Sequence, residues 1–496
     1  MKKAVVIGSG FAGLAAACFM AKAGWNVTVL EKHSMPGGRA RRFEAKGFTF
    51  DMGPSWYWMP DVFEHFFKSF GKKVDDYYEL QRLDPSYRIY WDDNVPMDIP
   101  ANYEALKALF ETEEPGASAQ LDAFMAEAAY KYQVGVQKLV YKPGQSLTEF
   151  IDLDLLKGLL RLDVFTSVRK HVHKFFKSKK LRQLLEFPVL FLGALPQDIP
   201  ALYTLMNYAD IKLGTWYPKG GMYKIAEGMH TLANELGVSF CFNTNVTRIV
   251  LEGHIAVAVE ATEQDKKMSF DADVIIGAAD YHFVEQQLLP STHRSYTEAY
   301  WNKRVMAPSC MLYYVGINKK LNNVLHHTLF FDVDFEMHGK EIYLAKQWPE
   351  EPLFYVSATS VTDDHAAPEN CENLFFLIPV AAGLTGDDEK LRKEYFDIIL
   401  KRFEQKTGES ISDNIVYNKS YAVSDFVSDY NAYKGNAYGL ANTLMQTAVL
   451  KPSLRSKKVS NLYYTGQLTV PGPGVPPSLI SGEVVAAEIN KKFKNT

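Results

Sequence analysis

The sequence has few cysteines and lacks a long uncharged apolar run. Its four cysteines in 496 residues stand far apart and include no Cys-x-x-Cys pair. This spacing argues against a zinc or iron–sulfur site and against a disulfide framework, and it is typical of proteins in a reducing compartment. No stretch reaches the roughly 18 apolar residues of a membrane-spanning helix. Any membrane contact is therefore expected to be peripheral.

A large excess of charge of one sign is also absent. The formal net charge is −4, so the chain has no global basic field and we predict no nucleic-acid partner. By contrast, 47% of the residues are hydrophobic, which is enough to fill large cores. The length favours two or more structural units, and the sequence carries no signal of oligomeric state.

The first forty residues hold the most specific pattern. Residues 4–7 are a short apolar run that predicts a buried parallel strand, and Gly8, Gly10 and Gly13 follow it in the spacing Gly-x-Gly-x-x-Gly. Residues 14–23 are rich in alanine and leucine and predict a closely packed helix. In such a unit the first glycine permits a sharp turn, the second lets a pyrophosphate approach the backbone, and the third lets the helix lie close to the strand.

A second strand and an acid complete this pattern. Residues 25–30 predict the strand, and Glu31 follows it. An acid at this place can accept hydrogen bonds from ribose hydroxyls, while the helix N-terminus offers free N–H groups and a positive dipole to phosphates. A glycine triple alone also occurs in ordinary turns. Because all five parts occur together, we predict a dinucleotide site here.

A second glycine-rich segment comes next. Residues 35–42 contain Gly37-Gly38-Arg39, and residues 47–55 end in Gly53-Pro54-Ser55. Paired glycines let backbone close over a phosphate, and a nearby arginine can neutralise it. We predict that these residues form a second wall of the same site. The later glycine clusters lack a strand before and a helix after them, so no second dinucleotide site is predicted, which argues against routine reduction by NADPH within the chain.

The order of these motifs resembles that of flavin-dependent amine oxidase-like enzymes and, within them, the bacterial-type carotenoid desaturases of the phytoene desaturase group. Four later segments carry the narrower resemblance, and they reach to the end of the chain: 217–229, 245–249, 272–280 and 461–482. The chain departs from the family pattern at Val470, Pro473 and Ala278, where the family often has His, Ala and Asn. These departures bear on the substrate more than on the flavin.

The resemblance implies an α/β fold. It would contain a Rossmann-like FAD-binding domain that is discontinuous in sequence, an α+β substrate domain and a helical membrane-facing region. The cofactor motifs assign residues 1–85, 215–285 and 455–496 to the FAD-binding domain, and 86–214 and 286–454 to the substrate-binding domain. Residues 100–210 look mostly helical, and the apolar runs 311–315, 353–356 and 374–378 would make a separate sheet.

The resemblance implies FAD as the cofactor, and the matching motifs supply candidate residues for binding it. These are Gly8, Ser9, Gly10, Phe11, Ala12, Gly13, Glu31, Lys32, Gly38, Arg39, Gly53, Pro54, Ser55, Val246, Gly466, Gly474 and Val475. No metal site is predicted. His171 and His173 would point apart on a helix, and the adjacent pair His326 and His327 does not resemble a pair of metal ligands.

The implied activity is the introduction of conjugated double bonds into a carotene or hydroxycarotenoid by hydride transfer to the flavin. Phytoene, a later carotene and a hydroxylated carotenoid undergoing 3,4-desaturation are all compatible substrates. The expected electron acceptor is oxygen or a quinone. The catalytic residues are not identified, because Glu149, Asp152, a water molecule or the flavin itself could take the proton.

Three other functions stay open on the sequence. Relatives that isomerise or otherwise oxidise carotenoids share the motifs. A soluble flavin oxidase of amines or porphyrinogens would also carry them, and it would show no dependence on lipid. A carotenoid carrier with structural FAD is a more remote alternative.

Residues 165–195 are a candidate membrane-docking segment. Apolar residues are interleaved with basic ones, and the apolar run 187–195 follows; the basic residues are Arg169, Lys170, His171, His173, Lys174, Lys177, Lys179, Lys180 and Arg182. Basic charge beside exposed aromatic rings suits docking on an anionic lipid surface. The expected location is cytoplasmic, at the inner face of the cell membrane. A solvated helix face followed by a core segment would give the same pattern.

Overall fold

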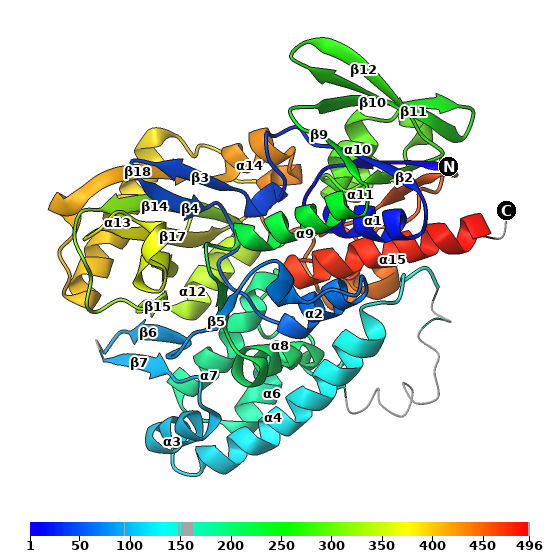
Figure 1. Ribbon diagram of the computed structural model, residues 1–496. Coiled ribbons are helices and arrows are strands. Elements are labelled where there is room, and N and C mark those ends of the chain that lie inside the picture. Colours follow the sequence, from blue (N-terminus) through cyan, green and yellow to red (C-terminus); the bar gives the residue numbers. More distant parts are fainter. Residues whose placement is uncertain (94, 147–148, 150–161, 495–496) are drawn as a thin grey trace.

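The computed structural model describes residues 1–93, 95–146, 149 and 162–494 (Figure 1). Its first layer is a five-stranded parallel sheet in the order β19-β13-β1-β2-β9. The strands are β1 (Lys3–Ile7), β2 (Asn26–Leu30), β9 (Ser239–Cys241), β13 (Val274–Gly277) and β19 (Leu462–Tyr464). The two strands predicted at the N-terminus are confirmed.

Side chains of β1 alternate between two cores, as a parallel strand covered on both faces requires. Ala4 and Val6 pack in one core with α1 (Phe11–Lys22), α9 (Tyr223–Glu235) and α15 (Val475–Lys494). Val5 and Ile7 pack in another core against a three-stranded antiparallel sheet on the opposite face. That sheet consists of β10 (Asn245–Glu252), β11 (Ile255–Glu263) and β12 (Lys266–Asp271).

Two glycines set the close packing of α1. A Cβ on Gly13 would lie 2.1 Å from the carbonyl oxygen of Gly8, so a side chain there would push the helix away from β1. A Cβ on Gly482 of α15 would lie 2.4 Å from the carbonyl oxygen of Ala12. These approaches let α1 lie against both β1 and α15, and they bring the last helix beside the first (Figure 1).

The second large sheet has seven strands in the order β18-β14-β17-β16-β15-β6-β7. Their bounds are β6 (Tyr87–Trp91), β7 (Pro96–Ile99), β14 (Ser309–Ile317), β15 (His327–Phe331), β16 (Phe354–Ser357), β17 (Glu372–Val380) and β18 (Ile415–Tyr421). The three apolar runs predicted to make a separate sheet pair directly as β14-β17-β16. On one face, Met311 and Tyr313 pack against α13 (Glu389–Thr407); on the other, Cys310 and Leu312 face the cavity described below.

Helices predominate between β7 and β8, as predicted for residues 100–210. The main ones are α3 (Tyr103–Glu113), α4 (Ala117–Val134), α6 (Val168–Phe175), α7 (Lys179–Glu186) and α8 (Leu205–Tyr208). Shorter elements complete the chain: β3 (Arg42–Ala45), β4 (Phe48–Asp51), α2 (Pro60–Lys68), β5 (Leu80–Arg82), β8 (Trp216–Pro218), α10 (Tyr281–Gln287), α11 (Glu298–Asn302), α12 (Phe335–Lys340) and α14 (Val423–Tyr430).

The first sheet is assembled from three separate stretches of chain, which contain β1 and β2, β9 and β13, and β19. The strands β6 and β7, which lie between the first two of these stretches, belong to the second sheet. The domain boundaries given above stay a prediction. Among the described residues no helix is long and apolar enough to cross a membrane.

The apolar residues of the candidate docking segment are largely core, with the exception of Phe165, which is 89% exposed. Val172, Phe176, Leu184 and Phe187 are buried, as is most of the 3-10 helix Phe187–Leu192. Two lysines of the docking segment form ion pairs: Lys180 with Asp93, and Lys179 with Asp92. The buried apolar side chains are therefore not presented to a membrane, because they fill the space between α4 and the second sheet.

Candidate functional site

A cavity of about 490 Å³ runs from the carboxyl ends of β1 and β2 to the face of the seven-stranded sheet. We call its two regions the cofactor end and the apolar end. The cofactor end is lined by the glycine motif and its neighbours. The apolar end is lined by side chains of β14 and β15 and of nearby helical segments, including Leu190, Leu192, Leu312, Leu329, Phe331 and Ile342.

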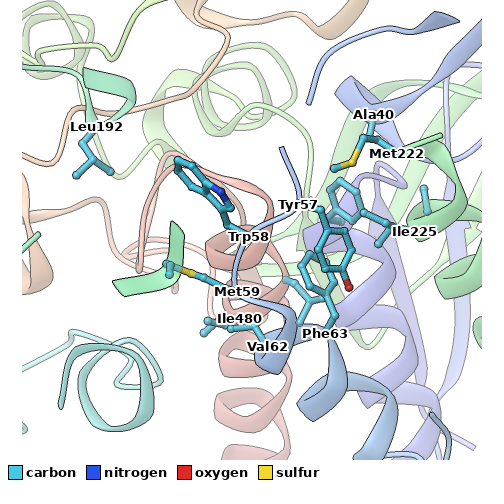
Figure 2. Packing of buried hydrophobic residues seen from close by; sticks show 14 of the residues in the cluster. Ala40, Tyr57, Trp58, Met59, Val62, Phe63, Leu192, Met222, Ile225 and Ile480 are labelled. Atoms are coloured by element: carbon cyan, nitrogen blue, oxygen red, sulfur yellow. The ribbon is translucent and has the colours of Figure 1, made fainter. Parts of the chain in front are cut away.

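Two tryptophans that follow the second glycine segment, Trp56 and Trp58, form part of the cavity wall. In Figure 2, Tyr57 and Trp58 point in opposite directions from the same segment. Tyr57 stacks on Phe63 in the core with ring centroids 4.5 Å apart, whereas Trp58 points toward Leu192 and lines the cavity. The indole N–H of Trp58 donates to Thr215 at 2.8 Å, which fixes the ring.

The two glycine segments meet at the cofactor end, as predicted. The N–H of Gly37 donates to the carbonyl of Ser9 at 2.9 Å, and a Cβ on Gly38 would lie 3.2 Å from the Cα of Gly10. Gly10 is the N-cap of α1, and no atom lies within 4 Å of where its Cβ would be. Unfilled space at a helix N-terminus is what a pyrophosphate needs.

Glu31 is buried at the end of β2. Its Oε2 accepts from the N–H and the hydroxyl of Ser9 at 2.8 and 2.7 Å, and its Oε1 accepts from the N–H of His33 at 3.0 Å. These bonds hold the carboxylate beside the glycine turn. It therefore lies where the predicted ribose contact requires it.

Arg39 faces the glycine turn from the second segment. Its Nη2 donates to the carbonyl of Asn436 at 3.1 Å, while its buried Nε has no partner among the described residues. Burial lowers the pKa of Arg39, and the nearby Asp280 opposes that shift. A half-buried guanidinium whose buried Nε is a spare donor fits an anionic group such as a diphosphate. Together with the open space over Gly10, this donor set fits a flavin dinucleotide.

The structure brings together all but one of the predicted cofactor-binding residues. The following line the cavity: Gly8, Ser9, Gly10, Phe11, Ala12, Glu31, Lys32, Gly38, Arg39, Gly53, Pro54, Ser55, Val246, Gly466, Gly474 and Val475. Gly13 does not belong to the wall. Its role is the helix–strand contact with Gly8 described above.

The sequence reasoning missed one wall segment. Phe426, Asp429, Tyr430 and Asn431, in and just after α14, line the cofactor end although they lie in the range predicted for the substrate domain. Asp429 pairs with Arg41 at 3.1 Å, an ion pair that ties α14 to the second glycine segment. No motif in this stretch signals a cofactor contact.

Asp51 has a structural role that its motif did not reveal. Its carboxylate accepts from the N–H groups of Met222 and Tyr223, at 2.7 and 3.0 Å, and so caps the start of α9. Burial raises the pKa of Asp51 to about 6. These two hydrogen bonds hold β4 to the glycine turn at Gly221. A Cβ on Gly221 would lie 2.8 Å from the carboxylate of Asp51.

Two other groups of ionisable residues lie outside the cavity wall. Glu127, Asp163 and His171 come close enough for a metal ion, but the buried ammonium of Lys131 lies 2.9 Å from Asp163 and supplies the cation there. The carboxylate of Glu149, one candidate proton acceptor, accepts from the backbone N–H groups of residues 144–146. Asp152, the other candidate, lies outside the described residues.

Comparisons with known proteins place nearly the whole chain in one family. The model of the family "Flavin containing amine oxidoreductase" matches residues 11–490. The chain is 42% identical to the carotenoid 3,4-desaturase of Haloarcula japonica, over 97% of this chain and 96% of that protein. It is 31% identical to the zeta-carotene-forming phytoene desaturase of Myxococcus xanthus, over 98% and 94%.

Solved structures share the fold. An oxidoreductase from Methanosarcina mazei superposes with a TM-score of 0.61 at 15% identity, covering 98% of this chain and all of that one. Cyclohexylamine oxidase from Brevibacterium oxydans gives a TM-score of 0.58 at 14% identity, covering 99% of each chain. At these identities the likeness shows the architecture alone.

Proposed function

The chain belongs to the flavin-containing amine oxidoreductase family, and from this premise we propose that it is an FAD-dependent carotenoid desaturase acting on a carotene or hydroxycarotenoid. The prediction of a flavin enzyme in this family is confirmed by the family match. The observation that carries the narrower proposal is the cavity itself, which joins the cofactor end to the apolar end. The names of the relatives above agree with it.

When bound, FAD supplies the acceptor for a hydride taken from a C–H bond. The chain's own residues bind and orient the two molecules. Gly10 and Arg39 would hold the diphosphate, and Glu31 the ribose. The apolar end, with Leu329, Phe331 and neighbouring side chains, excludes water and suits a long hydrocarbon. The electron acceptor that reoxidises the flavin is proposed to be oxygen or a quinone.

An anaerobic mixing experiment tests this function. The FAD-loaded protein on liposomes is mixed in turn with phytoene, lycopene-series carotenes and 1-hydroxycarotenoids, and flavin and polyene absorbance are followed together. We expect one substrate to bleach the flavin while its own absorbance shifts to the red, because each new double bond lengthens the conjugated system. Squalane, which has no allylic C–H bond, is the control and should leave the flavin oxidised.

Bleaching with a red shift for one substrate establishes desaturation and names the substrate. Absence of bleaching with every carotenoid contradicts the proposal. In that case an isomerase, an oxidase of another substrate or a carrier would explain the cavity better.

We further propose that the protein docks on the anionic inner face of the cell membrane through exposed apolar residues near the apolar end. Met337, Leu344 and Met445 are 56%, 66% and 72% exposed. Each lies within three residues of a residue that lines the cavity. Lys340 and Lys346 are exposed beside Leu344, and cations flanking apolar side chains suit an anionic bilayer.

Replacing Met337, Leu344 and Met445 together by glutamine is expected to weaken binding to vesicles of phosphatidylglycerol and phosphatidylcholine by about tenfold or more, because three apolar side chains no longer enter the bilayer. Co-sedimentation measures the binding. A double variant at exposed apolar residues elsewhere, Ile255→Gln with Ile398→Gln, is the control. Equal binding by the triple variant and the wild type would refute this docking surface.

A further inference from the structure

Three aromatic side chains from separate segments meet at the cavity wall. Trp56 follows directly after the second glycine segment, His327 begins β15, and Tyr355 lies in β16. In the β15–β16 register His327 pairs with Ser357 and Leu329 with Tyr355. His327 and Tyr355 are thus diagonal neighbours on the same face of the sheet. Trp56 and Tyr355 both line the cavity.

Short contacts join these three residues. The hydroxyl of Tyr355 lies 2.6 Å from Nδ1 of His327. The His327 ring lies flat on the Trp56 ring, with centroids 4.1 Å apart and planes inclined by 9°. Burial raises the pKa of Tyr355, and the side chains of Ser357 and Ser55 near its hydroxyl oppose that shift. The hydroxyl therefore lies between the predicted cofactor wall, to which Ser55 belongs, and the imidazole of His327.

His327 has the properties of a base that is protected from solvent. The side chain is fully buried, and its Nε2 has no partner among the described residues. Burial lowers the pKa of His327 well below its usual range, so the ring is neutral at physiological pH. The parallel Trp56 ring offers its π face to the imidazolium that forms when a proton arrives, which is a stabilising cation–π arrangement.

The carboxylates of the described cavity wall, and its histidine at the apolar end, are already engaged. The carboxylates of Glu31, Asp280 and Asp429 lie at the cofactor end and are held by the hydrogen bonds and ion pairs of that end. At the apolar end, His338 uses both ring nitrogens: Nδ1 accepts from the N–H of Leu353 at 2.9 Å, and Nε2 lies 3.1 Å from the carbonyl of Pro379.

We propose that Tyr355 and His327 form the relay that removes the proton during desaturation, an inference that rests on the proposed function. Bound FAD would supply the acceptor for the hydride, that is, the hydrogen and electron pair of one substrate C–H bond. The neighbouring C–H bond breaks, and its electron pair forms the new double bond. The proton moves to the oxygen of Tyr355, whose own proton passes to Nδ1 of His327. The relay therefore requires the His327 tautomer that carries hydrogen on Nε2.

In this relay Tyr355 touches the substrate, and His327 acts through it. Trp56 is a positioning residue, because it holds the imidazole plane and faces its charge. The substrate loses a hydride and a proton in total, so the step needs no reactant beyond the flavin that the family supplies. When the substrate leaves, the proton can return through Tyr355 to the cavity.

Replacing Tyr355 by phenylalanine tests the relay with the ring retained. We expect the anaerobic rate of flavin bleaching at saturating substrate to fall by about 100-fold, as for loss of a positioned acid–base group. FAD content and the substrate concentration at half-maximal rate should stay unchanged. His327→Phe, which retains a ring to stack on Trp56, should cause a similar loss, and the double variant should lose no more than either single variant.

Two readouts separate a relay from a structural role. Bleaching by the wild type should be slower in D₂O than in H₂O, and Tyr355→Phe should lose this difference. In the flavin-free protein, the ¹⁵N signal of His327 Nδ1 should be that of a hydrogen-bonded acceptor and should shift in Tyr355→Phe. Tyr395→Phe removes a buried hydroxyl that donates to Pro349 at 2.6 Å outside the cavity wall, and it should bleach at the wild-type rate.

Wild-type bleaching rates in both Tyr355→Phe and His327→Phe would overturn the relay while leaving the proposed function intact. Absence of bleaching in the wild type itself would overturn both. An Nδ1 signal typical of a protonated nitrogen in the flavin-free protein would also contradict the relay, because Nδ1 could then not receive the proton.

Discussion

Replacing Gly10 with leucine is expected to leave the chain folded and to abolish its retention of FAD. The backbone at Gly10 has φ −70°, which any residue adopts, and no atom lies within 4 Å of a Cβ built there. The leucine side chain would extend into the cavity at the N-terminus of α1. It would therefore occupy the space proposed for the pyrophosphate and block the N–H groups that bind it.

The measurement is the ratio of flavin to protein absorbance after purification, followed by titration of the flavin-free chain with FAD. We expect affinity to fall by about 100-fold or more, equivalent to about 2.7 kcal/mol. Circular dichroism and the urea midpoint of the flavin-free chain should match those of the wild type. Normal flavin content in Gly10→Leu would mean that the cofactor lies elsewhere.

Replacing Gly13 with alanine is expected to lower the stability of the fold strongly, whereas Gly10→Leu should leave it unchanged. The added Cβ would lie 2.1 Å from the carbonyl oxygen of Gly8 and 3.1 Å from the Cβ of Ala278. The first of these atoms is backbone and cannot rotate away, so α1 must move from β1. We expect a loss of about 3 kcal/mol in the free energy of unfolding, the upper end of the usual cost of overpacking.

Urea unfolding of the flavin-free chain, followed by tryptophan fluorescence, measures this loss. Gly10→Ala is the matched control, since it adds the same methyl group three residues earlier, where nothing is in contact. It should unfold at the wild-type midpoint. If Gly13→Ala also did so, the close approach of α1 to β1 would not contribute to stability.

Much of the cofactor end could be predicted because its signals are local in sequence. The turn at Gly8, the cap at Gly10 and the acid at Glu31 lie within one strand–helix–strand unit, whose geometry follows from short-range sterics and hydrogen bonds. By contrast, Asp429 and Tyr430 reach the same end from α14, far along the chain. Their placement depends on long-range packing, and their own sequence shows no pattern.

The docking segment shows a different limit of sequence reasoning. Residues 169–182 interleave basic and apolar side chains and are followed by the apolar run 187–195, a pattern that fits either a membrane face or a helix packed on a core. The neighbours decide between the two, and α6 and α7 bury their apolar faces within the protein. Exposed apolar residues such as Leu344 occur in short segments without periodicity, so no sequence pattern predicts their exposure.

The dinucleotide-binding unit, the family resemblance and three of the seven strands of the second sheet could be inferred from the sequence alone, because each depends on neighbouring residues. The tertiary structure alone decided which polar groups meet at the apolar end. In the sequence, His327 is one of two adjacent histidines for which no role is predicted, and neither Trp56 nor Tyr355 belongs to a functional motif. The register of β15 with β16 and the path of the chain after Ser55 bring the three together. Such contacts depend on strand pairing and packing between distant segments, which a local pattern does not encode.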